Sequence, residues 1–101
     1  MQKVEIIIPQ TNNSGESLGA VIAGVKTNLC NLFGGYTAFE AQGGWVSDSG
    51  ELFEEPVVVL ISAATKASDA QLITTIARDV LEITDQLAMF ISIDGQAQII
   101  D

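Results

Sequence analysis

The sequence predicts a single α+β domain, because segments rich in β-branched residues alternate with two segments whose apolar residues recur at helical spacing. The connections between these segments are rich in Gly, Asn, Asp and Ser, which are typical turn residues. A chain of 101 residues also has room for only one hydrophobic core. We therefore expect residues 1–101 to form one domain.

The chain opens with a predicted strand and a predicted helix. Residues 4–9 are mostly Val and Ile and end at a proline, as expected of a strand that runs into the flexible loop QTNNSG. In this loop Asn13 stands three residues before Glu16, a spacing that favours a helix N-cap. The helix is predicted over residues 15–32, and the paired glycines that follow it supply a C-terminal stop.

A β-hairpin is predicted in the middle of the chain. Residues 36–46 form its first strand, with a bulge at Gly43, and residues 47–50 form its turn. The return strand covers residues 51–62. It contains Pro56, which is tolerated more easily at a sheet edge or a bulge than inside a hydrogen-bonded ladder.

The last third of the chain predicts a helix followed by two strands. Ser68 and Gln71 form a capping-box pattern at the start of a helix that ends near Thr84. Residues 87–93 form a strand, and the Asp-Gly pair after it predicts a two-residue hairpin into a short C-terminal fifth strand. The complete order is the ferredoxin-like βαββαβ arrangement, a split βαβ sandwich in which right-handed crossovers place both helices on one sheet face.

Both faces of the predicted sheet are apolar. Residues 6–8 and 57–61 are apolar at both strand parities, although only one face packs against helices. Leaving about four such side chains wet, at about 1.5–3 kcal/mol each, would forgo a stabilisation comparable to that of a whole small domain. We therefore expect a homo-oligomer, a dimer or a higher assembly, formed through the helix-free sheet face. The alternative is that the hairpin at residues 36–50, or the tail, folds under the sheet.

The composition excludes several classes of function. Thirteen acidic residues against four basic ones give a net charge of -9, so direct binding to nucleic acid or to an anionic membrane is not expected. The chain has no His, and Cys30 is its only cysteine, so we expect no zinc site, no His-based triad and no internal disulfide, and we expect Cys30 to be a buried thiol. Neither a secretory signal nor a membrane span is recognisable. We therefore expect a cytoplasmic protein without a cofactor.

Trp45 and Arg78 are the most suggestive single residues. Trp45 follows two glycines and could provide a stacking platform for a ring-shaped ligand, or it could cover the end of the core. Arg78 could bind a carboxylate or a phosphate of a ligand, although an ion pair with Glu82, one helical turn away, is a simpler use. The acidic residues around the hairpin turn lack the spacing of a calcium-binding loop, so no metal site is expected there.

A spaced pattern of glycines and aromatic residues surrounds the hairpin. It combines a glycine-threonine strand, an A-x-G-x-W segment, a glycine turn and a glutamate before a hydrophobic strand. The residues that carry it are Phe33, Gly34, Gly35, Tyr36, Thr37, Ala41, Gly43 or Gly44, Trp45, Gly50, Glu55 and Val57 to Val59. The pattern resembles a family of small proteins known only as a domain of unknown function, whose members are lipoprotein- and phage-associated. The resemblance covers about residues 33–95 and implies a small α+β module of phage or mobile-element origin, without an established reaction.

These observations together favour a small acidic homo-oligomeric binding module without catalytic activity. Its ligand site is expected to contain Tyr36, Trp45, Glu55 and Arg78. The alternative is an acidic interaction protein or inhibitor that occupies a basic, nucleic-acid-binding surface of a host protein. Its contact residues would be Glu40, Asp48, Glu51 and Glu54. An enzyme that uses hairpin carboxylates with Mg²⁺ is the weakest interpretation, and no catalytic residue is assigned.

Overall fold

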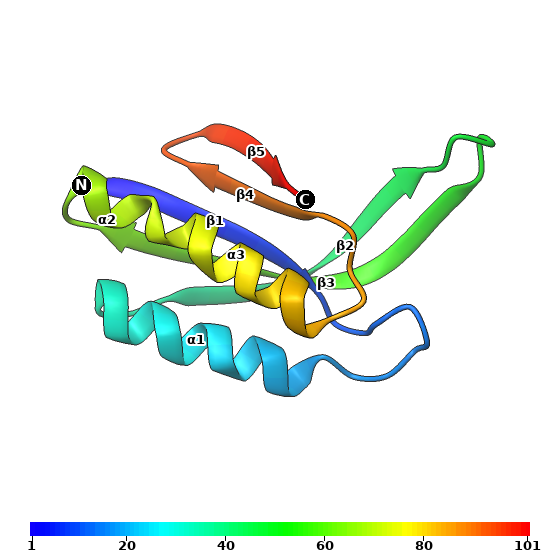
Figure 1. The fold of residues 1–101 in the computed structure, drawn as a ribbon, viewed down its shortest axis with the longest axis horizontal. Helices are drawn as coiled ribbons and strands as arrows, with labels where there is room; N and C mark the ends of the chain where they lie inside the picture. Colours follow the sequence, from blue (N-terminus) through cyan, green and yellow to red (C-terminus); the bar gives the residue numbers. More distant parts are fainter.

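A five-stranded antiparallel β-sheet with helices on one face forms the fold (Figure 1). The structure is a computed structural model that describes all of residues 1–101. The strands lie in the order β2-β3-β1-β4-β5, so the predicted α+β class and the predicted fifth strand are confirmed. The elements are β1 (Gln2–Pro9), α1 (Gly19–Phe33), β2 (Thr37–Val46), β3 (Leu52–Ala64), α2 (Ala67–Ala70), α3 (Leu72–Ile83), β4 (Met89–Ile93) and β5 (Gln96–Ile100).

The hydrophobic core lies between the helices and one face of the sheet. On β1, the buried residues Val4, Ile6 and Ile8 alternate with residues of the opposite face. Ile6 pairs with Leu60 of β3 on one side and with Ile91 of β4 on the other. Because successive strand residues point to opposite faces, these five side chains form one continuous apolar floor, on which α1 and α3 pack.

Helix α1 begins at Gly19, later than predicted, because the preceding loop satisfies its own polar groups. The side-chain oxygen of Asn12 accepts hydrogen bonds from the backbone N–H groups of Ser14 and Glu16, both at 2.9 Å. The backbone N–H of Asn12 also donates to the carbonyl of Glu16 at 2.8 Å. The N-cap position is therefore taken by Leu18, which makes no side-chain cap. The side chain of Asn12 thus stabilises a turn in the loop and does not cap the helix.

The second predicted helix is divided into α2 and α3 at Gln71. The carbonyl of Lys66 accepts from the N–H groups of both Asp69 and Ala70, at 3.0 and 3.2 Å, a shared arrangement typical of helix ends. Helix α2 has four residues and no side-chain cap, so the capping box predicted from Ser68 is not formed.

Strand β2 is regular, and the bulge predicted at Gly43 is absent. Its residues pair one to one with those of β3, from Thr37 with Ile61 to Val46 with Leu52. An extra unpaired residue, which defines a bulge, does not occur anywhere along this ladder. The long hairpin is therefore a continuous two-stranded ribbon.

Pro56 is tolerated inside β3 because of where β1 ends. The last pair between the two strands joins Pro9 to Val57, so at Pro56 strand β3 pairs with β2 alone. The carbonyl of Pro56 accepts from the N–H of Gln10 at 3.0 Å. Since the nitrogen and the carbonyl of one strand residue point to the same side, the proline nitrogen faces away from β2 and no ladder hydrogen bond is lost.

The β2–β3 hairpin twists as it leaves the body of the sheet. In Figure 1, β2 lies below β3 within the sheet and above β3 in the projecting part, so the two strands cross. Two-stranded ribbons twist more strongly than wide sheets. This twist explains why Trp45, Phe53 and Glu55, which share the strand parity of the helix-free face, lie beside the connection between α3 and β4.

No further layer of the chain packs on the helix-free face of the sheet, although Pro9, Val57, Val59 and Ser92 of this face are buried among their neighbours. The hairpin extends beyond the end of β1, and the C-terminal residues form β5 at the sheet edge (Figure 1). The alternative in which either segment folds under the sheet is therefore wrong.

Cys30 is exposed and not buried as expected. The buried stripe of α1 runs through Ile22, Val25 and Leu29. A residue one position beyond Leu29 is rotated by about 100° around a helix with 3.6 residues per turn, so Cys30 leaves the stripe.

None of the helices is long and apolar enough to cross a membrane.

Replacing Gly95 with alanine is expected to destabilise the fold by about 1–2 kcal/mol. Asp94 and Gly95 form the β4–β5 turn with φ values of 50° and 87°, which glycine adopts without strain. The loss would appear as a lower midpoint of urea unfolding. The matched control is Gly24→Ala in α1, where an added Cβ meets nothing within 4 Å and alanine is expected to stabilise the helix by about 0.5–1 kcal/mol. If Gly95→Ala and Gly24→Ala changed the stability of the fold in the same direction, this interpretation of the turn would be wrong.

Candidate functional site

The projecting hairpin carries a stacked aromatic pair. Trp45 of β2 and Phe53 of β3 are opposed in register, and their ring centroids lie 4.8 Å apart with 18° between the ring planes. Because directly opposed residues of antiparallel strands have their side chains on the same face, the two rings stack on each other and form an apolar wall that presents the ring edges and the outer ring faces. Trp45 is 54% exposed and Phe53 is 39% exposed. Ring surface is therefore available to a ligand.

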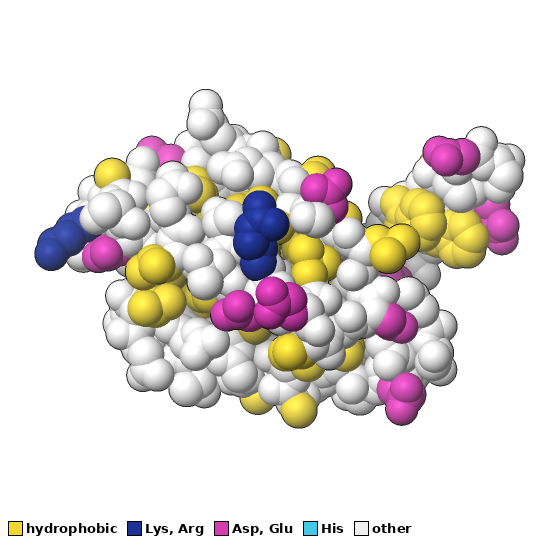
Figure 2. All heavy atoms as spheres, viewed as in Figure 1, with side chains coloured by type: hydrophobic (Ala, Val, Ile, Leu, Met, Phe, Trp, Pro, Cys, Tyr) yellow, Lys and Arg dark blue, Asp and Glu magenta, His cyan; other side chains and the backbone are white.

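This aromatic wall borders a cavity of about 710 Å³. The other side of the cavity comes from the loop between β1 and α1 and from the connection between α3 and β4. Figure 2 shows hydrophobic side chains gathered where the projecting hairpin meets the body of the molecule. The volume falls within the range of about 300–1,000 Å³ that is usual for ligand sites. The lining residues are Asn13, Trp45, Phe53, Glu55, Gln86, Leu87 and Ala88.

Hydrogen bonds hold the far wall of the cavity in place. The backbone N–H of Asn13 donates to Oδ2 of Asp85 at 3.0 Å, and its side-chain amide donates to the carbonyl of Asp85 at 3.2 Å. Thr84 anchors the same connection to α3, since its hydroxyl donates to the carbonyl of Val80 at 2.7 Å and accepts from the N–H of Gln86 at 3.3 Å. Asn13, which was expected to cap a helix, thus joins the two loops that form this wall.

Glu55 is the only charged residue that lines the cavity. Its side chain is half-buried, and it takes part in neither a hydrogen bond nor the single ion pair of the chain, which joins Lys3 to Glu5. Across the hairpin Glu55 is opposed by Gly43. A Cβ at Gly43 would lie 3.1 Å from Cγ1 of Val57, so the glycine lets the neighbouring Val57 pack closely against β2. An unpaired carboxylate at the border of an apolar cavity is available to a cationic ligand.

The structure separates the four residues expected to form a ligand site. Trp45 and Glu55 line the same cavity, whereas Tyr36 lines an open hollow of about 660 Å³ near the other end of the sheet. The nine residue steps of strand between Tyr36 and Trp45 span about 30 Å. Arg78 is exposed on α3 and lines neither space. It also forms no ion pair with Glu82, so the pair expected from their spacing is absent.

The acidic residues of the alternative interpretation do not converge. All four are exposed, and Glu54 accepts a hydrogen bond from the side-chain amide of Gln42. No group of three or more potential metal ligands comes together in the structure. Glu40 lies in the body of the sheet, opposite Val58, whereas Asp48, Glu51 and Glu54 lie on the projecting part of the hairpin.

Several residues that line the cavity were not predicted from the sequence. Phe53 could have been found by counting outward from the turn, because the N–H of Ser47 donates to the carbonyl of Glu51 and the two aromatic residues lie two positions outside these residues. Asn13 and Gln86 come from connections far apart in the sequence. No local pattern encodes that these connections lie next to each other.

The comparisons with known proteins relate this architecture to an enzyme. No protein-family model matches the chain, and no curated protein matches its sequence. The chain shares its fold with a phage SAM lyase. For the lyase in complex with S-methyl-5′-thioadenosine, the TM-score is 0.69 at 14% sequence identity, over 99% of this chain and 84% of the lyase chain. For the same type of enzyme in its apo state, the TM-score is 0.68 at 13% identity, over 97% and 85% of the two chains.

This similarity contradicts the expected function. We expected a binding module without catalytic activity, with an inhibitor of a nucleic-acid-binding protein as the alternative, whereas the structural neighbours are enzymes. The expectation rested on the absence of His-based triads, activated nucleophiles and metal-ligand motifs from the sequence. S-Adenosylmethionine carries its own activated leaving group in its sulfonium, so an enzyme that acts on it needs none of these motifs. The absence of such motifs was therefore a poor reason to make an enzyme the weakest interpretation.

Proposed function

We propose that this chain is an enzyme that cleaves S-adenosylmethionine, as a SAM lyase does. One observation within the chain carries the proposal, together with the shared fold. The unpaired carboxylate of Glu55 borders a ligand-sized cavity that is walled by the Trp45–Phe53 pair.

Three features of S-adenosylmethionine match this cavity. Its adenine ring can stack on Trp45, since aromatic side chains bind nucleobases through their faces. Its positively charged sulfonium can pair with Glu55 and lie against the aromatic wall. Its polar edges can form hydrogen bonds with the amides of Asn13 and Gln86. The net charge of -9 additionally favours the approach of a substrate whose own net charge is positive.

The chemistry of the cleaved bond explains why so simple a site would suffice. The bond joins the sulfonium sulfur to the γ-carbon of the methionyl chain, and its electron pair stays on sulfur, which leaves as neutral S-methyl-5′-thioadenosine. As this bond breaks, the carboxylate of the methionyl chain attacks the γ-carbon and closes a ring, so the step needs neither water nor a base from the protein. The residues of this cavity bind and orient the substrate and limit the access of water to it. Because the positive charge disappears from sulfur, Glu55 holds the substrate more tightly than the product.

The activity is tested by incubating the purified chain with S-adenosylmethionine and measuring S-methyl-5′-thioadenosine by chromatography. Release in proportion to protein concentration, above a blank without protein, is expected, because S-adenosylmethionine also decomposes slowly by itself. No release above the blank, even with protein equimolar to substrate, would rule the proposal out.

Replacing Trp45 with alanine is expected to weaken binding of S-methyl-5′-thioadenosine about tenfold, because stacking of a base on an aromatic side chain contributes about 1–3 kcal/mol. Calorimetric titration compares the variant with the unchanged chain. In the unchanged chain Trp45 is the only tryptophan, so its emission reports ligand binding directly. The control is Val46→Ala on the opposite face of the same strand, where the side chain is 63% exposed. Equal affinities for the Trp45 and Val46 variants would mean that the adenine base does not stack on Trp45.

We also assign the fold to the ferredoxin-like βαββαβ type with one additional strand. The assignment is supported by the strand order β4-β1-β3-β2, to which β5 is added beside β4, and by the position of both long helices on one sheet face. A phage origin and a cytoplasmic location belong to the same proposal, since the structural neighbours are phage enzymes and S-adenosylmethionine is an intracellular metabolite.

A further inference from the structure

Asp85 holds two amide side chains that line the cavity. Its Oδ2 accepts a hydrogen bond from the backbone N–H of Asn13 at 3.0 Å, and its backbone carbonyl accepts from the side-chain amide of Asn13 at 3.2 Å. Its Oδ1 accepts from Nε2 of Gln86, also at 3.2 Å. The nitrogens of both amides are therefore turned toward Asp85, which does not line the cavity itself.

The oxygens of the same two amides remain free. Neither Oδ1 of Asn13 nor Oε1 of Gln86 accepts a hydrogen bond within the chain. Because the oxygen and the nitrogen of an amide lie on opposite sides of its carbon, a side chain that gives its nitrogen to Asp85 offers its oxygen to a ligand. The carboxylate of Glu55 is also an acceptor, and the indole N–H of Trp45 is the only other side-chain donor of the lining.

A ligand that pairs with these oxygens has to donate hydrogen bonds. S-Methyl-5′-thioadenosine, which lacks the amino-acid part of S-adenosylmethionine, donates through its ribose hydroxyls and through the 6-amino group of adenine. The hydroxyls can also accept, so they fit either polarity of a cavity. The 6-amino group only donates, whereas a 6-oxo group in its place only accepts. A 6-oxo group opposite an amide oxygen would leave both acceptors without a partner.

We propose that Asp85 is a positioning residue through which the cavity selects a 6-amino purine over a 6-oxo purine. Asp85 fixes the amides of Asn13 and Gln86 so that their oxygens accept from the 6-amino group. A site built to hydrogen-bond one polar group discriminates strongly against a substrate that lacks it. This inference rests on the proposed function, because it takes the adenine of S-adenosylmethionine as the base bound in this cavity.

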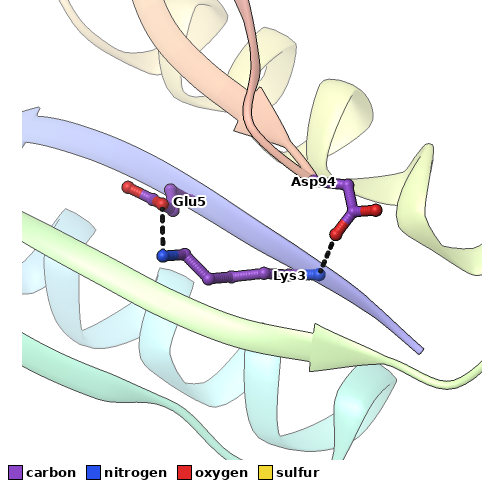
Figure 3. Close-up of polar contacts among 3 residues, drawn as sticks. All are labelled: Lys3, Glu5 and Asp94. Atoms are coloured by element: carbon purple, nitrogen blue, oxygen red, sulfur yellow. Dashed lines mark hydrogen bonds and ion pairs between the residues drawn. The ribbon is translucent and has the colours of Figure 1, made fainter.

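Asp94 is a second aspartate that joins distant parts of the chain, and it serves as the comparison. Its carboxylate accepts from the backbone N–H of Lys3 at 3.5 Å, beside the ion pair of Lys3 with Glu5 at 3.1 Å (Figure 3). Asp94 lies in the β4–β5 turn and lines the open hollow that contains Tyr36, not the cavity. Of these two aspartates, only Asp85 holds amides of the cavity.

The selectivity is measured by calorimetric titration with S-methyl-5′-thioadenosine and with S-methyl-5′-thioinosine, its 6-oxo counterpart. The unchanged chain is expected to bind the 6-amino ligand at least about tenfold more tightly. In Asp85→Asn, the new amide keeps its oxygen opposite the backbone N–H of Asn13, which can only donate, so its nitrogen faces Gln86. Gln86 then turns its oxygen toward position 85 and its nitrogen toward the ligand. The two ligands are therefore expected to bind this variant about equally.

A second substitution distinguishes this reversal from a loosened fold. Adding Gln86→Glu to Asp85→Asn is expected to restore the selectivity, because a carboxylate can accept both from the new amide and from the ligand. The matched control is Asp94→Asn, which removes the same charge and is expected to keep the selectivity of the unchanged chain. Asparagine tolerates the φ of 50° at position 94. Circular dichroism establishes that each variant is folded.

The proposal is supported if Asp85→Asn abolishes the selectivity, Gln86→Glu restores it and Asp94→Asn retains it. Equal binding of both ligands to the unchanged chain, or unaltered selectivity in Asp85→Asn, would overturn it. A chain that binds neither ligand would overturn it as well. Release of S-methyl-5′-thioadenosine from S-adenosylmethionine decides the proposed function separately, since a chain that cleaves the substrate without selecting its base would refute only the role of Asp85.

Discussion

Glu55→Gln is expected to weaken binding of S-adenosylmethionine by about 10- to 100-fold, which corresponds to about 1.4–2.8 kcal/mol. The substitution keeps the size of the side chain and removes its charge. Glu55 is the only charged residue of the cavity and forms no ion pair within the chain. The weaker binding would therefore reflect only the lost contact between the carboxylate and the sulfonium. The affinity for neutral S-methyl-5′-thioadenosine is expected to change little. Calorimetric titration with the two ligands measures this difference.

In kinetic measurements, Glu55→Gln is expected to raise KM more than it lowers kcat. Glu55 pairs with a charge that the substrate carries before the reaction, so its removal weakens substrate binding more than it slows the bound complex. The matched control is Glu54→Gln, because Glu54 is exposed on the opposite strand face and is bonded to Gln42. If Glu55→Gln and Glu54→Gln behaved alike, or if Glu55→Gln weakened both ligands equally, the assigned role of the carboxylate would be wrong.

The elements that the sequence predicted correctly are those whose signal is local. Strand β1 follows from its run of β-branched residues, and the Asp94-Gly95 turn follows from the backbone preferences of two residues. The start of α1 was misplaced because two asparagines stand side by side, and the sequence does not tell which one is used in a turn and which one joins another loop. Asn12 closes the turn and Asn13 binds Asp85, so neither caps the helix.

The candidate site was predictable only where its residues share one hairpin. Trp45 and Glu55 lie on paired strands, so strand parity already places them on one face. Tyr36 was grouped with them because of its residue type, although the length of β2 keeps it at a distance. The twist that turns this part of the hairpin toward Gln86 and Leu87 is a property of the whole ribbon, and no single residue in the sequence indicates it.

Leu60→Ala is expected to lower the free energy of unfolding by about 2–5 kcal/mol, a large share of the about 5–15 kcal/mol that stabilises a typical domain. Leu60 has no exposed surface and lies in β3 between Ala38 of β2 and Ile6 of β1. The small Ala38 cannot fill the space that the substitution leaves, so a cavity remains at the floor of the core. Urea unfolding at one fixed protein concentration measures the loss, because self-association would make the midpoint depend on concentration.

The matched control is Leu52→Ala on the same strand. Leu52 is 59% exposed on the projecting hairpin, so the same loss of side-chain atoms is expected to cost less than about 1 kcal/mol. A cost at Leu52 equal to that at Leu60 would mean that the hairpin is packed against another surface in solution. Leu52 has the strand parity of the helix side of the sheet, so such a surface would differ from the helix-free face. The two leucines thus distinguish the stability of the core from contacts made by the arm that carries the candidate site.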